Sequence, residues 1–226
     1  MKKVITLLLG MILFYACSSS SDSNGNTTIT VSDIDGNTYE AIAIGNQTWT
    51  KKNLIVTKYR NGDVIPQVTD PAAWANLTTG AWCYFNNETA NGTVYGKLYN
   101  WYAVIDPRGL APTGYHIPTD SEWTTLTTFL GGEDIAGGKM KETGTIYWNS
   151  PNTGATNSSN FSGLPGAARE NNGVFTIIRN NGNWWCATEN SIDNAWSRNL
   201  GYNYSNCGSY AFNNKHNALS VRCVKD

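Results

Sequence analysis

The residues best suited to chemistry lie in the segment 114–126, which reads G-Y-H-I-P-T-D-S-E-W-T-T-L. It places His116 close to two carboxylates, Asp120 and Glu122. A histidine beside carboxylates is a common arrangement for general acid–base catalysis. The alternative is structural. Asp120 would then lie in the first turn of a helix, where the helix dipole favours an anion, and His116 would be a hydrogen-bonded histidine at an edge of the core. We favour the structural interpretation.

The spacing within this segment is typical of a helix N-terminus. Thr119 and Glu122 stand three apart, as in a capping box, in which each side chain accepts a hydrogen bond from the other's backbone. Ile117 and Trp123 flank the cap with the spacing of a hydrophobic staple. The pattern predicts one well-defined helix from about residue 120 to about residue 130, ended by two glycines.

The composition is that of a loop-rich domain. The 226 residues are 40% hydrophobic and 15% charged, against roughly 25% charged in average soluble proteins. Gly, Trp and Tyr are abundant, with 22, 9 and 12 copies, which does not suit a helical bundle. The formal net charge is −1 and no basic cluster is present, so nucleic acid is not an expected partner.

The N-terminus has the form of a lipoprotein signal peptide, residues 1–16. Two lysines precede a short apolar run, which is too brief for a membrane span of roughly 20 residues. The sequence F-Y-A-C that follows resembles a bacterial lipobox, although Phe14 stands where Leu is usual. We expect lipid on Cys17 and a flexible tether over residues 17–27, rich in serine. The alternative is an ordinary secretory signal with an incidental cysteine.

Four further cysteines remain in this exported chain: Cys83, Cys186, Cys207 and Cys223. An even number suggests two disulfides, for which three connectivities exist. No C-x-x-C pair is present, and His116 and His216 lack ligand-like spacing, so no metal site is expected from these residues.

Short β segments separated by glycine and asparagine make up most of the rest. A hairpin is expected over residues 28–44, with its turn at Asp35-Gly36-Asn37. Further strands are expected at 48–50, 82–85, 174–179, 184–188, 195–200, 210–212 and 219–224, a loop at 86–92, a short helix within 95–104 and a short helix or turn at 133–142. Strands, then a helix, then a loop-rich antiparallel β half indicate the α+β class.

Several blocks resemble the Fibrobacter succinogenes major paralogous domain family. The blocks are I-G-N-Q-T-W-T-K-K-N-L (44–54), G-K-L-Y-N-W-Y-A-V (96–104), G-Y-H-I-P-T-D-S-E-W (114–123), G-G-K-M-K-E-T-G (137–144), W-W-C-A-T-E-N (184–190), A-W-S-R-N-L (195–200) and S-V-R-C-V-K-D (220–226). The resemblance implies a single domain over residues 28–226, with a fold like C-type lectins and the sulfatase-modifying (formylglycine-generating) enzymes. Proteins of that family are mostly exported surface lipoproteins of undefined biochemical role.

The resemblance to formylglycine-generating enzymes raises the question of whether this chain has their copper site. Those enzymes use two cysteines five apart, whereas Cys186 is followed at that spacing by Ser191. Oxidase activity is therefore not expected. We expect instead a Cys186–Cys207 disulfide, and a second between Cys83 and Cys223.

The resemblance to C-type lectins raises calcium-dependent sugar binding. Oxygen-bearing side chains gather in one loop, and hard oxygen ligands suit calcium. The candidate binding residues are Glu189, Asn190, Asp193, Asn194 and Trp196. The alternative, which we favour, is an Asx-rich turn that its own side chains cap. Trp184 and Trp185 must point to opposite faces of a strand, so one should be core and only the other could bind.

The expected function is that of a lipid-anchored, non-catalytic binding module at the outer membrane surface, for a glycan or a partner protein. The motivation is the anchor, the tether, the lectin-like resemblance and the lack of a coherent catalytic set. A structural or fimbria-associated surface subunit is the main alternative, and a formylglycine-generating-type oxidase is a third. No cofactor is expected, calcium being the one candidate.

Overall fold

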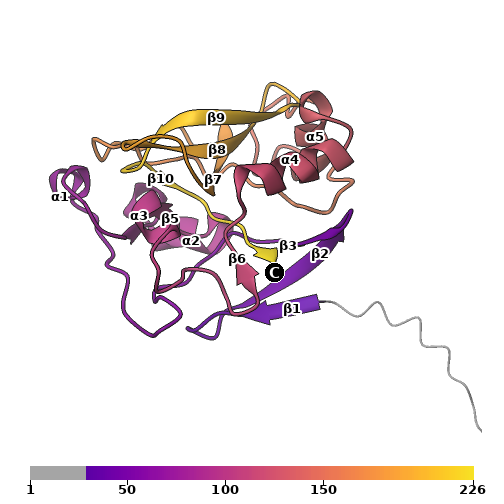
Figure 1. Ribbon diagram of the computed structural model, residues 1–226. Coiled ribbons are helices and arrows are strands. Elements are labelled where there is room, and N and C mark those ends of the chain that lie inside the picture. The colour runs from indigo at the N-terminus through magenta and orange to yellow at the C-terminus, as the bar shows by residue number, and fades with distance from the viewer. Residues whose placement is uncertain (1–28) are drawn as a thin grey trace, which may run out of the picture.

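The computed structural model describes residues 29–226, which form three antiparallel sheets and short helices (Figure 1). The predicted signal peptide, the lipidation site Cys17 and the tether lie outside the described residues. Antiparallel sheets with few helices agree with the predicted α+β class.

The first sheet has the order β1-β2-β3-β11-β6. Its strands are β1 (Ile29–Ser32), β2 (Thr38–Ile44), β3 (Gln47–Thr50), β6 (Tyr115–His116) and β11 (Val224–Lys225). The predicted hairpin is confirmed, with β1 and β2 joined by a turn in which Gly36 has a φ of 82°. Asp33 fixes this turn because its carboxylate accepts from the backbone N–H groups of Asp35 and Asn37, both at 3.0 Å.

The second sheet, β10-β5-β4, lies beside three short helices. The strands of this sheet are β4 (Trp82–Cys83), β5 (Leu98–Asn100) and β10 (Ala218–Leu219). The helices are α1 (Pro71–Ala75), α2 (Thr89–Tyr95) and α3 (Trp101–Val104), and the 3-10 turn η1 (Phe85–Asn87) precedes α2. The expected loop at 86–92 was wrong, because most of it belongs to η1 and α2. The sequence T-A-N-G-T-V-Y lacks strong helix formers, and a Cβ at Gly92 would meet the Tyr84 ring at 2.1 Å, so packing against that ring decides the conformation.

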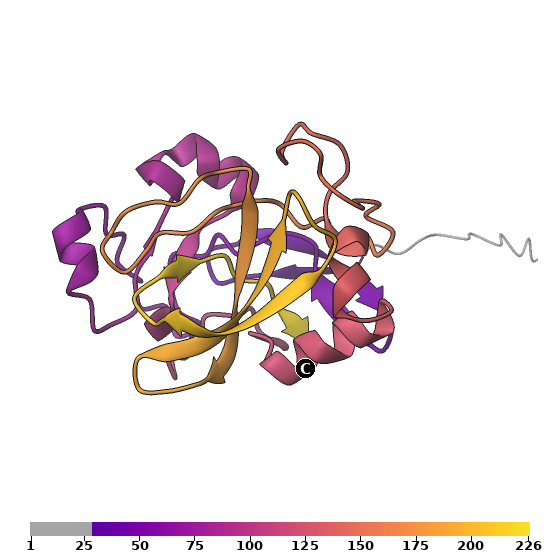
Figure 2. The same cartoon turned by 90° about the horizontal axis from the view of Figure 1, so that it is seen from above.

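The predicted capping box is confirmed at the start of α4 (Asp120–Phe129). Thr119 accepts from the Glu122 N–H at 3.2 Å, and the Glu122 carboxylate accepts from the Thr119 N–H at 2.8 Å. Ile117 and Trp123 are both buried but belong to different hydrophobic clusters, so the expected staple does not describe their packing. The predicted second short helix is α5 (Glu133–Met140). Seen from above, α4 and α5 lie on the opposite side of the molecule from α1 and α2 (Figure 2).

The third sheet consists of β7 (Asn181–Glu189), β8 (Asn194–Gly201) and β9 (Cys207–Asn214) in that order. These strands confirm three of the predicted β segments, whereas the expected strand at 174–179 forms only an isolated bridge at Phe175. Trp184 and Trp185 point to opposite faces, as predicted, but both are fully buried. Trp184 packs in the cluster under α4 and α5, and Trp185 packs against the second sheet. Neither indole is therefore available to a ligand.

The four cysteines that the structure describes are free, buried thiols, so neither expected disulfide is present in it. Cys207 pairs with Leu200, which pairs with Gly182, four residues before Cys186. Cys186 and Cys207 therefore lie two strands apart, and at ~4.8 Å per strand this spacing alone is roughly 10 Å. A disulfide needs Cα atoms about 4.4–6.8 Å apart. Cys83 and Cys223 likewise belong to different clusters and different parts of the fold.

Buried lysine and arginine side chains donate hydrogen bonds to backbone carbonyls of the loops, which is unexpected in a chain with so few charged residues. Those in the described part of the chain are Lys97, Lys141, Arg169, Arg198, Lys215 and Arg222. Lys141, for example, donates to the carbonyls of Thr153, Gly201 and Tyr204 at 2.6–2.8 Å. Such contacts satisfy backbone carbonyls that irregular loops leave without strand partners.

Candidate ligand-binding groove

The predicted binding residues 189–196 lie at the end of β7, in the turn that follows it and at the start of β8, and they do not gather into one site. Glu189 pairs with Ala195, so Trp196, the next residue along, points to the opposite face of the hairpin. Trp196 packs partly buried in the cluster beneath α4. Asn190 and Ser191 donate backbone N–H bonds to the Asn194 carbonyl at 3.0 and 2.9 Å. The favoured interpretation, an Asx-rich turn, agrees with this geometry.

The ammonium group of Lys215 lies beside the turn that contains the candidate calcium ligands. The Lys215 ammonium pairs with the Glu189 carboxylate and donates to the Ile192 carbonyl at 2.7 Å. It also lies 4.7 Å from the centre of the Trp101 ring. Of the candidate calcium ligands, the Glu189 carboxylate is thus already paired with an internal ammonium. No group of three His, Cys, Asp or Glu side chains within residues 29–226 is arranged to hold a metal ion.

His116 lies between two carboxylates at the end of β6. Its Nδ1 is 2.7 Å from Asp226 Oδ1, and its Nε2 is 2.7 Å from Glu122 Oε1. Burial alone would lower the pKa of His116, but these two hydrogen bonds raise it overall. Burial would raise the pKa of Glu122, whereas bonds from Thr119 and His116 lower it overall. Both ring nitrogens are engaged, so the ring joins the helix cap to the C-terminal strand.

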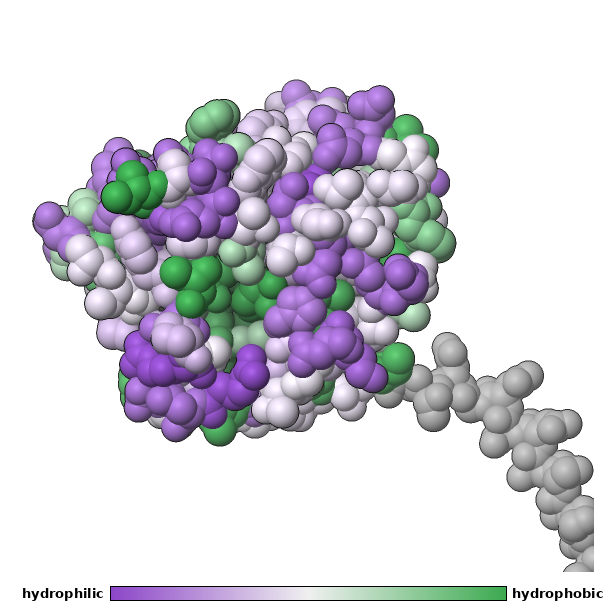
Figure 3. All heavy atoms as spheres, in the orientation of Figure 1, coloured by the Kyte–Doolittle hydropathy of each residue, from purple (hydrophilic) through white to green (hydrophobic). Residues whose placement is uncertain are grey.

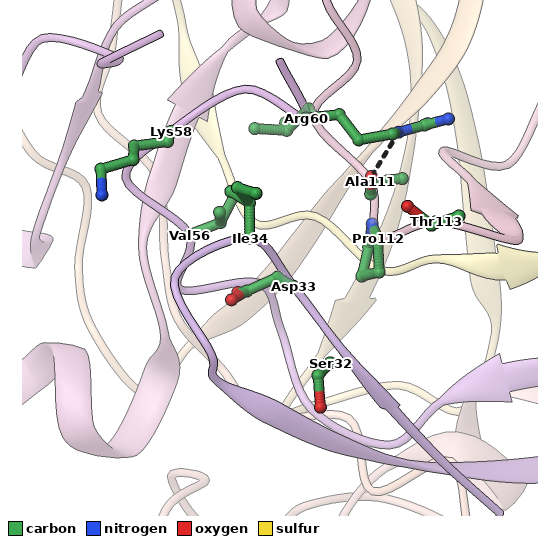
Figure 4. A pocket seen from close by; sticks show the side chains of 10 residues that line it. Ser32, Asp33, Ile34, Val56, Lys58, Arg60, Ala111, Pro112 and Thr113 are labelled. Atoms are coloured by element: carbon green, nitrogen blue, oxygen red, sulfur yellow. Dashed lines mark hydrogen bonds between the residues drawn. The ribbon is translucent and has the colours of Figure 1, made fainter. Parts of the chain in front are cut away.

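A small pocket of about 150 Å³ lies between the β1–β2 turn and residues 110–113. Figure 4 shows that its two cations, Lys58 and Arg60, extend to opposite sides of it. The Arg60 Nε donates to the Ala111 carbonyl at 3.1 Å, and Lys58 lies 3.5 Å from Asp35. The cations do not converge, so this pocket offers no built anion site.

A much larger groove, of about 970 Å³, lies between the first sheet, α2 and the loop that follows α5. Its walls come from segments far apart in sequence. They are Thr30, Thr38, Tyr39 and Glu40 of the β1–β2 hairpin, Lys51, Lys52, Asn53 and Ile55 after β3, Gly92, Thr93, Val94 and Gly96 around α2, Glu142, Tyr147, Ser162 and Leu164 of the later loop, and Arg222.

Close backbone packing shapes one wall of this groove. Gly96 ends α2 with a φ of 80°, and a Cβ there would lie 2.9 Å from the Asn53 side chain. Asn53 donates from Nδ2 to the Tyr95 carbonyl at 2.8 Å, and its Oδ1 accepts from Trp184 and Arg222. The 53–54 segment is therefore held firmly against α2, which gives the groove a fixed floor.

The groove combines charged, hydroxyl and aromatic side chains. Lys51 pairs with Glu40 at 3.0 Å, whereas exposed Lys52 has no carboxylate partner among the described residues. The Glu142 carboxylate accepts from Asn157 Nδ2 at 3.1 Å and from the Thr143 N–H at 3.2 Å. Three cations against two carboxylates give the lining a slight positive charge, on a chain whose net charge is −1.

A sequence model of the Fibrobacter succinogenes major domain matches residues 42–225, most of the chain. The chain belongs to this family. No curated protein and no solved structure matches it. The match confirms the family that the sequence blocks indicated. Most of the groove lies within the matched Fibrobacter succinogenes major domain, and only the residues from β1 and the start of β2 precede it.

Sequence analysis missed the groove. Except for Glu40, its charged residues occur inside blocks that resemble the Fibrobacter succinogenes major domain, namely 44–54, 137–144 and 220–226. The meeting of these blocks in space could have revealed the groove, but the local sequence of a block does not show which other blocks it contacts. Within residues 29–226 of this domain, no helix combines the length and hydrophobicity needed to cross a membrane.

Proposed function

We propose that this domain is a non-catalytic binding module of the cell envelope whose groove holds a glycan chain. The observation that carries the proposal is the groove itself. Its volume of about 970 Å³ lies at the upper end of the roughly 300–1,000 Å³ typical of small-molecule sites, so it suits an oligomer better than a single sugar. The C-type lectin-like relationship that the sequence resemblance implies belongs to the same proposal.

The lining favours a glycan over a peptide. Peptide-binding grooves usually offer a continuous apolar floor for anchor side chains. Here the floor contains Asn53 and Arg222, and hydroxyl groups of Thr93 and Ser162 line the walls. Tyr147, which is partly buried, supplies an aromatic face of the kind that stacks on sugar rings. Alternating donors, acceptors and aromatic surface match the hydroxyl-rich edges and apolar faces of sugars.

Three observations support a non-catalytic role. The groove contains no histidine or cysteine among its lining residues. Both ring nitrogens of His116 are engaged by carboxylates elsewhere. Burial raises the pKa of the Cys186 thiol, and of the Cys207 thiol to about 12, whereas a copper-binding or nucleophilic cysteine must be a thiolate. The oxidase alternative is therefore disfavoured.

The proposed localisation in the cell envelope rests on the sequence of the N-terminus. A lipid on Cys17 would tether the domain to a membrane, and surface exposure would bring the groove to extracellular glycans. Metabolic labelling with a radioactive fatty acid should mark the protein in cells, and the Cys17→Ser variant should lose the label. Equal labelling of both forms would refute the anchor while leaving the groove proposal intact.

The binding test uses the purified protein on an array of plant and microbial oligosaccharides. We expect binding that the Tyr147→Ala variant weakens about tenfold, which corresponds to ~1.4 kcal/mol. Tyr210→Ala is the matched control, because Tyr210 is half exposed on β9, outside the groove. Binding that Tyr210→Ala weakens as much as Tyr147→Ala would contradict the groove assignment. Capture of a protein but no glycan would favour the partner-protein alternative.

The structural-subunit alternative has one observation of its own. β9 is an edge strand, and it exposes Phe212, at 82%, beside half-exposed Tyr210. Edge strands with exposed apolar residues can pair with other chains. The face shown in Figure 3 has scattered hydrophobic residues and one hydrophobic area in a hollow near its centre, among hydrophilic residues. Assembly through β9 predicts a concentration-dependent oligomer that Phe212→Lys abolishes, and a monomer at all concentrations would argue against it.

A further inference from the structure

Arg222 is a buried cation beneath the groove. It is 1% exposed, and its Nε donates to Asn53 Oδ1 at 2.7 Å. Its Nη1 donates to the carbonyls of Thr50 and Phe161 at 2.7 and 2.9 Å, and its Nη2 donates to the Ser162 carbonyl at 3.2 Å. These bonds use four of the five guanidinium N–H groups. The remaining Nη2 N–H has no acceptor within residues 29–226.

The positive charge of Arg222 is not neutralised by any carboxylate in the described part of the chain. Its surroundings contrast with those of Arg198, which is equally buried. Arg198 pairs with Asp120 at 2.6 Å and with Glu133 at 2.7 Å. Burial lowers the pKa of Arg222 to about 9. The charge is surrounded by neutral carbonyls, an amide and the Phe161 ring, whose centre lies 4.4 Å from the guanidinium carbon. A buried cation without an anion is costly, and an anion that reached it would gain correspondingly.

Lack of a carboxylate does not by itself mark a ligand site. Arg169 also lacks one, and it donates to three carbonyls and lies against the rings of Trp74 and Phe175. The difference is access, because Arg222 lines the groove and Arg169 does not. On the groove wall, Lys52 adds a second cation with no carboxylate partner. Arg222 therefore borders the groove without a carboxylate partner. Lys52 borders it without a salt bridge, although Lys52, after Lys51, also helps to lower the pKa of Glu40.

We propose that the groove selects glycans that carry carboxylates, with Arg222 donating to a uronate oxygen at the floor and Lys52 contributing from the wall. This inference rests on the proposed glycan-binding function and narrows it to acidic chains. Arg222 supplies a single free N–H, so it contacts one carboxylate oxygen. Lys52, with three rotatable donors on a flexible stem, attracts the charge without fixing its geometry.

The test compares two forms of one sugar chain, oligogalacturonate and its methyl ester, by isothermal titration calorimetry. The ester keeps the ring and the linkage but removes the charge. We expect the acid to bind at least tenfold more tightly than the ester, and the preference to shrink several-fold in Lys52→Gln. The matched control is Lys225→Gln, because Lys225 is exposed on β11 and does not line the groove. A sulfated oligosaccharide tests whether carboxylate or any anion is recognised.

A second measurement observes Arg222 without altering it, since a variant there could fail to fold. The side-chain Nε–H resonance of Arg222 should shift on addition of oligogalacturonate and stay in place with the ester. Equal affinity for acid and ester would overturn the inference and leave the proposed function standing. Binding of neither chain, nor of any other glycan tested, would overturn both. Acid-selective binding without a shift at Arg222 would overturn the role given to this arginine, as would a stronger response to sulfate.

Discussion

His116 shows how a residue that looks catalytic from its neighbours can have a structural role. Its ring joins Glu122 of the helix cap to Asp226 beyond β11, so three segments of the chain meet at one imidazole. The histidine side chain is 39% exposed, which limits the energy of each ion pair through solvent screening. The charged form of His116 matches the two carboxylates, and the neutral form can donate to only one of them.

His116 should make the stability of the protein depend on pH. Its pKa in the folded state is raised above 6.5, so its stabilisation is fully present below about pH 6.5 and is lost as the pH rises through the folded value. The pKa of Glu122 is lowered from 4.5, so its share is lost as the pH falls through that lowered value. Urea unfolding of wild type and His116→Gln should therefore differ most between about pH 5 and 6.5 and converge by about pH 9. His216→Gln is the control, and a pH-independent difference for His116→Gln would contradict the account.

Lys141 is an example of a buried cation with a structural role. Three carbonyls from two distant loops accept from its ammonium, and its replacement by methionine would leave them without a donor. We expect Lys141→Met to reduce the free energy of unfolding by about 3 kcal/mol. Lys139→Met, in the last turn of α5 just before Lys141 and partly exposed, should cost less than about 0.5 kcal/mol. Urea denaturation of both variants tests this, and equal losses would show that Lys141 has no special role.

At the scale of the elements, local sequence decides some boundaries and tertiary packing decides others. The capping box of α4 is a local signal, and it placed the helix correctly. The Asp35-Gly36-Asn37 turn did the same for the first hairpin. By contrast, α2 contains no strong local signal and depends on the fit of Gly92 against Tyr84. The expected strand at 219–224 is in fact two strands, β10 and β11, of two residues each. Strands this short do not show enough alternation of apolar and polar residues to be told apart in the sequence.

The capping box gives a direct element-scale prediction. Thr119→Ala removes the hydroxyl that accepts from the Glu122 N–H, so it should destabilise the protein by about 1 kcal/mol. Thr125→Ala is the control, since Thr125 is an exposed residue of the same helix that bonds only to the Ser121 carbonyl. The midpoint of urea unfolding measures both. If Thr119→Ala proved as mild as Thr125→Ala, the cap would contribute little to stability.

At the scale of the whole molecule, the groove depends on contacts between distant segments. Lys52 and Arg222 are 170 residues apart in the sequence, yet they line one hollow. No periodicity or motif spacing reports such a meeting, because it arises from the pairing of β11 with β3 and from the packing of α2 on residues 53–54. For the same reason the sequence directed attention to the β7–β8 turn, where oxygen-bearing side chains are dense in the sequence but Lys215 already pairs with Glu189.

Backbone chemical-shift mapping of the labelled protein with oligogalacturonate, and then with its methyl ester, is the decisive test of acidic-glycan binding in the groove. We expect the amides that move to lie in residues 51–55 and 92–96 and near Ser162, around the groove. Shifts confined to residues 189–196 or to β9, or no shifts with either chain, would contradict it.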